Sequence, residues 1–174
     1  MRLLIADDCD AMRENLKCFI RRHPDIEVIG EAADGEAAVE LAKEMAPDVV
    51  LMDISMPKLN GIEAAAHILK DNAAARVTVL SAYSNRAFVM AGLKAGISGY
   101  VLKTSIIDDL IPALRAATAN ELFLSSEIAD LVSEQHAKQL PKADRTASGT
   151  QEQTEPATGF LRWNNQDMPD GTGT

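Results

Sequence analysis

Residues 47–57 read Pro47-Asp48-Val49-Val50-Leu51-Met52-Asp53-Ile54-Ser55-Met56-Pro57, and the turn dipeptide Asn60-Gly61 follows them. The four apolar residues Val49–Met52 form a run of the length and composition of a strand buried on both faces. The run ends at Asp53, and the loop Ile54–Pro57 would keep this carboxylate accessible. The pattern predicts a central strand of a parallel sheet with an acidic group at its carboxyl end, where such sheets bind ligands.

Strand-like runs and helical spacing alternate over the first 120 residues. The other strand-like runs are Leu3–Ala6, Ile26–Gly30, Val77–Leu80 and Tyr100–Leu102. Between them, apolar residues at intervals of three or four predict helices over 12–20, 38–45, 62–69, 84–95 and 107–114. Because strands separated by helices form parallel sheets, we expect a doubly wound α/β fold with five strands and helices on both faces.

Turn and cap residues divide the rest of the chain. Ser105, with Asp108 three residues later, is typical of a capping box that opens the helix over 107–114. Ser125-Ser126 are plausible caps for a short amphipathic helix ending near His136. The last 34 residues, 141–174, contain few large apolar side chains, which predicts disorder. We therefore divide the chain into a domain over 1–120, a linker with a short helix over 121–140, and a disordered tail over 141–174.

Composition excludes several protein classes. The 174 residues are 47% hydrophobic, and no apolar run approaches the length of about 20 residues that a membrane helix needs. The first apolar run reaches Asp7-Asp8 too early to form a signal peptide, so we expect a cytoplasmic protein without membrane insertion. The net charge of -9 makes direct binding to DNA an unfavoured expectation.

Polar residues follow four of the five expected strands. Asp7-Asp8 follow the first, Asp53 the third, Ser81 the fourth and Lys103 the fifth. Because the carboxyl ends of parallel strands meet at one edge, these side chains should share one pocket. Three carboxylates and one ammonium leave the pocket near a formal charge of -2. Oxygen ligands of this kind suit Mg²⁺, so Asp7, Asp8 and Asp53 are candidate metal ligands.

The same pocket predicts phosphoryl chemistry. A cation held by the acids would reduce the repulsion between Asp53 and an incoming phosphoryl group, so that Asp53 can act as a nucleophile. Lys103 would hold one phosphoryl oxygen as a point charge, and the Ser81 hydroxyl would donate to another. The product would be an acyl phosphate on Asp53.

With these residues and the string at 47–57, residues 1 to about 120 resemble the receiver domain of bacterial two-component response regulators. The resemblance implies a flavodoxin-like fold and a phosphoacceptor, Asp53, that takes its phosphoryl group from a sensor histidine kinase or a phosphotransfer protein. It also implies Mg²⁺ as the cofactor, with Asp7, Asp8 and the backbone carbonyl of Ser55 among its ligands. Lys103 matches a lysine characteristic of the family.

The resemblance assigns further roles around the fourth strand. Ser81 is similar to the hydroxyl that switches on phosphorylation, and Tyr100 to the aromatic ring whose position reports it. Ala82 is small enough to admit a phosphodonor. Tyr83 is bulky and would shield the acyl phosphate from water, which implies a long-lived phosphorylated state.

Three classes of function compete for this sequence. Residues Gly96–Thr104 and Leu122–Ala129 resemble the subgroup that leads into a LuxR-type helix-turn-helix, yet residues 141–174 are fewer than the about 60 that such a domain needs. We therefore expect phosphorylation-dependent contacts with an unknown downstream protein. The alternative is a DNA-binding transcriptional regulator whose output domain is degenerate, truncated or unrecognised.

The third class is a metabolic enzyme, which the sequence disfavours. No G-x-G-x-x-G motif follows the first strand, and a phosphatase usually carries its nucleophile there rather than after the third strand. The only catalysis expected is self-catalysed phosphotransfer and autodephosphorylation. Val89 and Leu93 are expected to add exposed apolar surface to the helix over 84–95, which would allow a homodimer.

Overall fold

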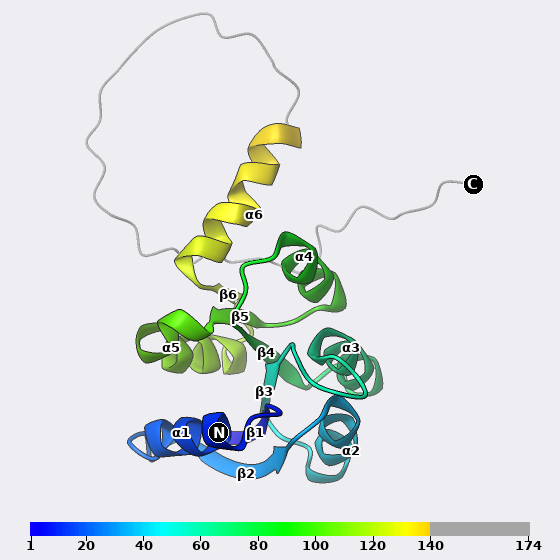
Figure 1. Cartoon of the computed structure of the whole chain (residues 1–174), viewed down its shortest axis with the longest axis vertical. Coiled ribbons are helices and arrows are strands. Elements are labelled where there is room, and N and C mark those ends of the chain that lie inside the picture. The colour runs from blue at the N-terminus through cyan, green and yellow to red at the C-terminus, as the bar shows by residue number, and fades with distance from the viewer. Residues whose placement is uncertain (140–174) are drawn as a thin grey trace, which may run out of the picture.

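The fold is built on one parallel sheet of six strands. In this computed structural model, which describes residues 1–139 and side chains through Ser133, the strand order is β2-β1-β3-β4-β5-β6 (Figure 1). The strands are β1 Arg2–Ala6, β2 Glu27–Ala32, β3 Val49–Asp53, β4 Arg76–Ser81, β5 Gly99–Leu102 and β6 Phe123–Leu124. The central position of β3 explains why all five of its residues are buried.

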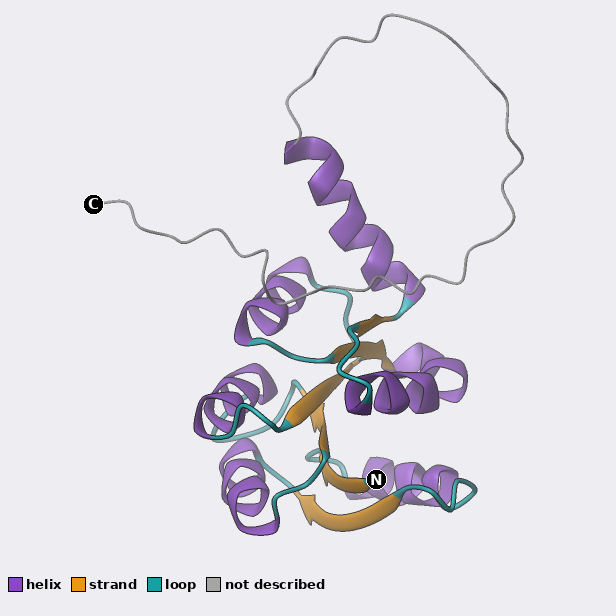
Figure 2. Ribbon diagram, turned by 180° about the vertical axis from the view of Figure 1, so that it is seen from behind, coloured by secondary structure: helices purple, strands orange, loops and turns teal. Residues whose placement is uncertain are grey.

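Helices cover both faces of the sheet. They are α1 Asp10–Ile20, α2 Gly35–Met45, α3 Gly61–Asp71, α4 Arg86–Ala95, α5 Ile106–Thr118 and α6 Ser126–Gln139, with a short 3-10 helix, η1, at Lys103–Ser105. Helices α1 and α5 lie on one face, and α2, α3 and α4 lie on the other, while α6 projects away from the sheet (Figure 2). This arrangement is the doubly wound α/β fold expected from the alternation of periods, and it has the flavodoxin-like form that the family resemblance implies.

Alternation along β3 separates two apolar cores. Val49 and Leu51 pack with side chains of α1 and α5, whereas Val50 and Met52 pack with α2, α3 and α4. Successive side chains of a strand point to opposite faces, so a continuous apolar run is what a strand covered on both faces requires. The next residue, Asp53, emerges at the carboxyl end between the two cores.

The prediction of five strands is wrong by one, because β6 adds a sixth. Its two residues, Phe123 and Leu124, pair in parallel with Gly99 and Tyr100 of β5. The Phe123 N–H donates to the Ser98 carbonyl at 3.0 Å. Two residues are too short to show a periodicity, and only the tertiary pairing to β5 makes them a strand. The sheet therefore extends past residue 120.

Two local predictions, the Ser105 cap and the exposure of Val89, are also wrong. Helix α5 begins after Ser105, but the Ser105 hydroxyl makes no cap; it donates to the Leu102 carbonyl at 3.2 Å. Side-chain caps occur instead at Asp34, Asn60 and Asn85, which open α2, α3 and α4. Val89 is fully buried, because its side of α4 packs onto the sheet, so it adds nothing to an exposed apolar surface.

The helix expected after Ser125-Ser126 is present as α6 and is longer than predicted. Ile128 is fully buried, and the flanking Leu131 and Val132 pack partly buried against the same core. The tail expected over 141–174 lies outside the described residues. Among residues 1–139, every helix is too short or too polar to cross a bilayer.

Candidate functional site

Three carboxylates meet at the carboxyl edge of the sheet. Asp7 follows β1, Asp8 comes directly after it, and Asp53 ends β3. One carboxylate oxygen of each lies within 4.8 Å of those of the other two. Asp7 and Asp53 are almost completely buried, whereas Asp8 is exposed and gives the cluster an open side. The sheet has therefore brought together the three acids predicted to share a pocket.

Lys103 completes the cluster. It begins η1 directly after β5, and its Nζ lies 2.8 Å from Asp7 Oδ2 and 3.1 Å from Asp53 Oδ1. Burial raises the pKa of Asp53, an effect that Lys103 opposes and neighbouring Asp7 reinforces. Burial lowers the pKa of Lys103, but its bonds to both carboxylates outweigh this and leave that pKa raised. The lysine therefore stays protonated beside an acid that resists ionisation.

Backbone and side-chain bonds hold the loop after β1. The Cys9 N–H donates to Asp7 Oδ1 at 2.9 Å, which fixes the orientation of that carboxylate. Arg13, one turn into α1, donates to the Asp7 backbone carbonyl at 2.6 Å and pairs with Asp10 and Glu31. The guanidinium thus ties the acidic loop to both α1 and β2.

Gly61 allows α3 to approach the end of β3. A Cβ atom at this position would lie 1.9 Å from the backbone carbonyl oxygen of Asp53. The Gly61 N–H donates to the Ile54 carbonyl at 3.0 Å, and the Asn60 side chain caps the helix. The Asn60-Gly61 pair therefore sets how closely α3 packs behind Asp53.

Ser81 and Tyr100 meet at the backbone of Tyr83. The Ser81 hydroxyl accepts from the Tyr83 N–H and donates to the Tyr83 carbonyl, both at 3.0 Å. The Tyr100 hydroxyl donates to the same carbonyl at 2.9 Å. The Tyr100 side chain is fully buried, and burial raises its pKa. The hydroxyl expected to serve a phosphoryl group is thus bonded to its own loop in this conformation.

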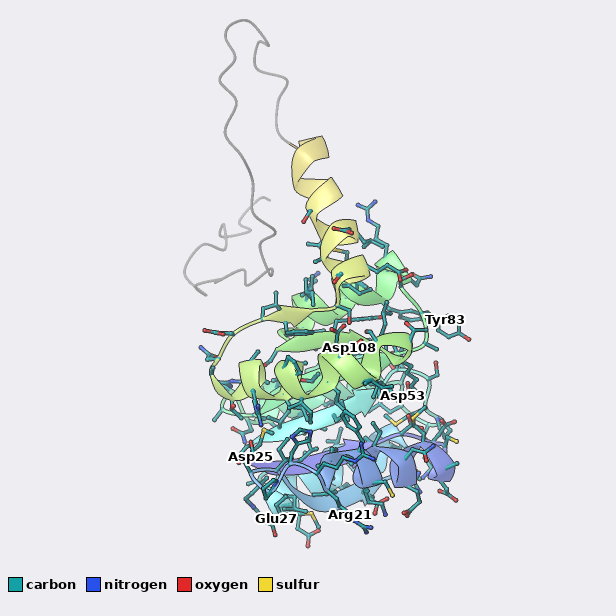
Figure 3. All side chains as sticks on the ribbon, turned by 90° about the vertical axis from the view of Figure 1, so that its left-hand side faces the viewer. Arg21, Asp25, Glu27, Asp53, Tyr83 and Asp108 are labelled. Carbon is teal, nitrogen blue, oxygen red and sulfur yellow. The ribbon has the colours of Figure 1, made fainter. Side chains whose placement is uncertain are left out.

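The remaining predicted residues lie in the loops after β3 and β4. Ala82, Tyr83 and Ser55 are exposed, and Ser55 lies in the loop directly after Asp53. The Tyr83 side chain is 62% exposed and extends outward on the same side of the molecule as Asp53 (Figure 3). The loops after β3 and β4 thus present exposed residues near the carboxyl ends of both strands.

The donor set suits a hard divalent cation. Two buried carboxylates and one exposed carboxylate present oxygen ligands at close range, and Lys103 alone does not balance their charge. Oxygen-rich sites with an open side suit cations that retain water. The acidic cluster is thus chemically able to bind a metal ion.

Comparison with known proteins identifies this arrangement. The family model of the response regulator receiver domain matches residues 3–115. The chain belongs to the response regulator receiver family. The region matched by this family contains every residue of the acidic cluster, together with Lys103, Ser81 and Tyr100.

Relatives of this receiver include transcriptional regulators and a response regulator of the LuxR family. The transcriptional regulatory protein LiaR of Bacillus subtilis is 40% identical over 132 residues, which span 76% of this chain and 63% of LiaR. A two-component response regulator of the LuxR family from Aurantimonas superposes with a TM-score of 0.75 at 36% identity, covering 78% of this chain and 97% of that one. The receiver chain therefore spans less than two thirds of LiaR.

A further solved structure shows a relative on DNA. Two RcsB dimers bound to two parallel DNAs include a chain that superposes with a TM-score of 0.70 at 27% identity, covering 76% of this chain and 68% of that one. Dimerisation and DNA binding are thus properties of that relative.

Sequence reasoning missed three contributors around the site. Arg13 carries no motif signal, because its hydrogen bond to the Asp7 carbonyl depends on how the loop between β1 and α1 folds. Gly61 was identified only as a turn residue, and its contact with the Asp53 backbone depends on helix packing. Ser125 was expected only as a cap, yet it is buried and bonded to three other elements.

Proposed function

We propose that this receiver accepts a phosphoryl group on Asp53 from a histidine kinase or phosphotransfer protein in a Mg²⁺-dependent reaction. The observation that carries the proposal is the placement of a nearly buried Asp53 within 4.8 Å of two further carboxylates and 3.1 Å from Lys103. This geometry supports the proposal of a phosphoacceptor, a cation site and a fixed positive charge close together.

Phosphoryl transfer to Asp53 takes place in a single displacement step. A carboxylate oxygen of Asp53 attacks phosphorus, the bond from phosphorus to the donor histidine nitrogen breaks, and the imidazole keeps the electron pair. The new bond is the acyl phosphate on Asp53. Asp53 has to be ionised to attack, and Lys103 lowers its pKa by holding an ammonium 3.1 Å away.

Asp7, Asp8 and Asp53 would hold Mg²⁺, with the carbonyl of Ser55 as a further ligand. Bound Mg²⁺ would neutralise phosphoryl oxygens and so reduce their repulsion by the acidic cluster. Lys103 moves from its bonds with Asp7 and Asp53 to a phosphoryl oxygen. Because it then leaves one or both carboxylates, phosphorylation changes which groups the η1 segment contacts.

Ser81 and Tyr100 would carry the signal away from Asp53. The Ser81 hydroxyl reaches a phosphoryl oxygen only by giving up its bond to the Tyr83 carbonyl. Tyr100 donates to that same carbonyl, so movement of the loop after β4 alters the environment of its ring. This shared acceptor supports their proposed roles as a switch pair.

The experiment compares wild-type protein with Asp53→Asn during incubation with acetyl phosphate and Mg²⁺. Intact-mass measurement should show one added phosphoryl group on the wild type and none on the variant, while circular dichroism shows both folded. Asp48→Asn is the control, because Asp48 precedes β3 at the opposite end of the strand. Phosphorylation of Asp53→Asn at the wild-type level would refute the assignment.

The proposed output is phosphorylation-dependent binding to another protein. The net charge of -9 supports a protein partner over a DNA backbone. The receiver would then act as a cytoplasmic signalling protein whose catalysis is limited to its own phosphotransfer and dephosphorylation.

The second candidate is DNA-binding transcriptional regulation, which the names of the relatives favour. Fluorescence anisotropy with a labelled duplex of mixed sequence distinguishes the two at low salt. The protein-partner output is supported if neither phosphorylation state binds the duplex with a Kd below about 100 μM. The reason is that DNA-binding proteins bind non-specific DNA with Kd values typically between about 1 and 100 μM. Binding within that range that weakens with salt supports the DNA-binding regulator.

A further inference from the structure

Ser125 lies where β5, β6 and α6 meet. The proposed phosphotransfer gives this residue no role. Its backbone N–H donates to the Tyr100 carbonyl at 3.0 Å, which extends the pairing between β5 and β6. Its carbonyl accepts from Ile128 at 2.8 Å and from Ala129 at 2.9 Å, which opens α6. The residue is 2% exposed. One buried serine therefore both ends the sheet and begins the last described helix.

The Ser125 hydroxyl also binds the segment that carries Lys103. Its oxygen accepts from the Leu102 N–H at 3.2 Å and donates its proton to the Asp109 carboxylate of α5. The Ser105 hydroxyl lies 3.1 Å from it and reaches the Leu102 carbonyl at 3.2 Å. Both backbone polar groups of Leu102 are thus held by this cluster of Ser105, Asp109 and Ser125, which we term the hydroxyl cluster.

The hydroxyl cluster binds the residue that directly precedes Lys103 of the phosphoacceptor site. Leu102 directly precedes Lys103, whose ammonium bridges Asp7 and Asp53 in this structure. A phosphoryl group on Asp53 offers Lys103 a new partner, so the ammonium and the backbone behind it have to adjust together. The backbone N–H of the preceding residue, Leu102, donates a hydrogen bond to the Ser125 hydroxyl.

Beyond Ser125, the apolar side of α6 packs beside Tyr100. Ile128 is fully buried in the same core as Tyr100 and Val89, and Leu131 and Val132 pack partly buried against it. Burial of these side chains fixes α6 beside β6, against the core that contains Tyr100 and Val89. The switch aromatic and the helix therefore share one packed core.

We propose that Ser125 is a positioning residue that couples the placement of Lys103 to the seating of α6, and this inference rests on the proposed phosphorylation of Asp53. In the unphosphorylated state the Leu102–Ser125 bond holds both. When Lys103 follows the phosphoryl group, that bond is lost and α6 loosens from the core that contains Tyr100 and Val89. Because coupling is reciprocal, seated α6 disfavours phosphorylation by the same factor by which phosphorylation loosens α6.

The test uses beryllium fluoride with Mg²⁺ as a phosphoryl mimic on the full chain. Hydrogen exchange of the peptide covering 126–133 should speed up by about 5-fold or more when the mimic binds wild-type protein. Ser125→Ala should exchange at the faster rate without the mimic and respond little to it. By reciprocity, its apparent Kd for the mimic should fall by a similar factor, a change that a purely structural role would not produce.

Matched variants separate coupling from loss of structure. Asp109→Ala removes the carboxylate that accepts from Ser125 and should reproduce both effects even where Ser125→Ala folds poorly. Ser126→Ala and Asp108→Ala are the controls, because both residues are exposed neighbours. Wild-type behaviour in Ser125→Ala and Asp109→Ala would overturn the inference.

The same measurement distinguishes this failure from failure of the proposed function. If the mimic changes exchange around Asp53 and Tyr83 while residues 126–133 are unaffected in the wild type, the coupling is absent and phosphorylation stands. If the mimic leaves the whole protein unchanged, the proposed function fails and the coupling with it.

Discussion

The Lys103 ammonium lies 3.1 Å from Asp53 and 2.8 Å from Asp7, so one cation serves two buried or nearly buried carboxylates. With Asp8 beside them, the folded protein holds more negative charge in this pocket than Lys103 cancels. The raised pKa of Asp53 reflects its burial and the neighbouring charge of Asp7. The functional arrangement therefore lowers the stability of the folded protein.

Asp53→Asn should raise the Tm at neutral pH in the absence of divalent cations. Because the pKa of Asp53 is raised on folding, its contribution to stability is complete only below its unfolded pKa and is lost as pH rises through the folded pKa. Asparagine does not titrate, so the advantage of the variant should grow from acidic to neutral pH. Thermal unfolding across that range measures it, and a lower Tm for the variant at neutral pH would contradict this explanation.

Mg²⁺ should stabilise the wild-type protein because it binds the folded acidic cluster. At ten times its Kd the ion adds about 1.4 kcal/mol, which corresponds to a Tm rise of about 3–6 °C for a chain of this size. Asp8→Ala should lose most of this rise, since Asp8 supplies one of the three carboxylates. Asp71→Ala, at the exposed end of α3, should keep it. A Tm that ignores millimolar Mg²⁺ in the wild type would remove the metal assignment.

Gly61→Ala should impair both stability and phosphorylation. Helix propensity alone would favour alanine by up to about 1 kcal/mol, but the new Cβ would lie 1.9 Å from the Asp53 carbonyl oxygen. The backbone of Asp53 or the start of α3 has to shift, so we expect a lower urea midpoint and slower reaction with acetyl phosphate. Gly30→Ala is the control, because its Cβ meets the flexible end of Met45 at 2.7 Å. Full activity in Gly61→Ala would show that the close approach is unimportant.

Tyr83→Ala should shorten the lifetime of the acyl phosphate if the ring folds over the phosphorylated site. The side chain is 62% exposed in this conformation, so shielding requires the loop after β4 to move once Asp53 is modified. Decay of phosphorylated protein, followed by intact mass, measures the lifetime. Phe88→Ala provides a matched loss of an exposed aromatic ring on α4. Unchanged or slower decay in Tyr83→Ala counts against shielding.

Thr78→Val should stabilise the protein by about 1 kcal/mol. The Thr78 hydroxyl on β4 is fully buried and has no hydrogen-bond partner among the described residues. Valine has nearly the same shape and removes the unpaired polar atom. Thr118→Val should bring no such gain, because the exposed Thr118 hydroxyl donates to the Arg115 carbonyl at 2.8 Å. Chemical unfolding of both variants provides the comparison.

The amino-acid pattern was sufficient for five of the six strands and for the members of the acidic cluster. Continuous apolar runs such as Val49–Met52 indicate strands covered on both faces, and parallel pairing then brings Asp7, Asp53 and Lys103 to one edge. These inferences succeed because they depend on local periodicity and on a general property of parallel sheets.

Tertiary packing decided what local pattern does not encode. Strand β6 exists because Phe123 and Leu124 meet β5, and Ser105 bonds to Leu102 rather than capping α5. The Ser81 hydroxyl is held by Tyr83, and Ser125 joins Leu102 to Asp109 across 23 and 16 residues of sequence. A serine hydroxyl can form hydrogen bonds of similar energy with many groups, so only the assembled fold decides which group is its partner.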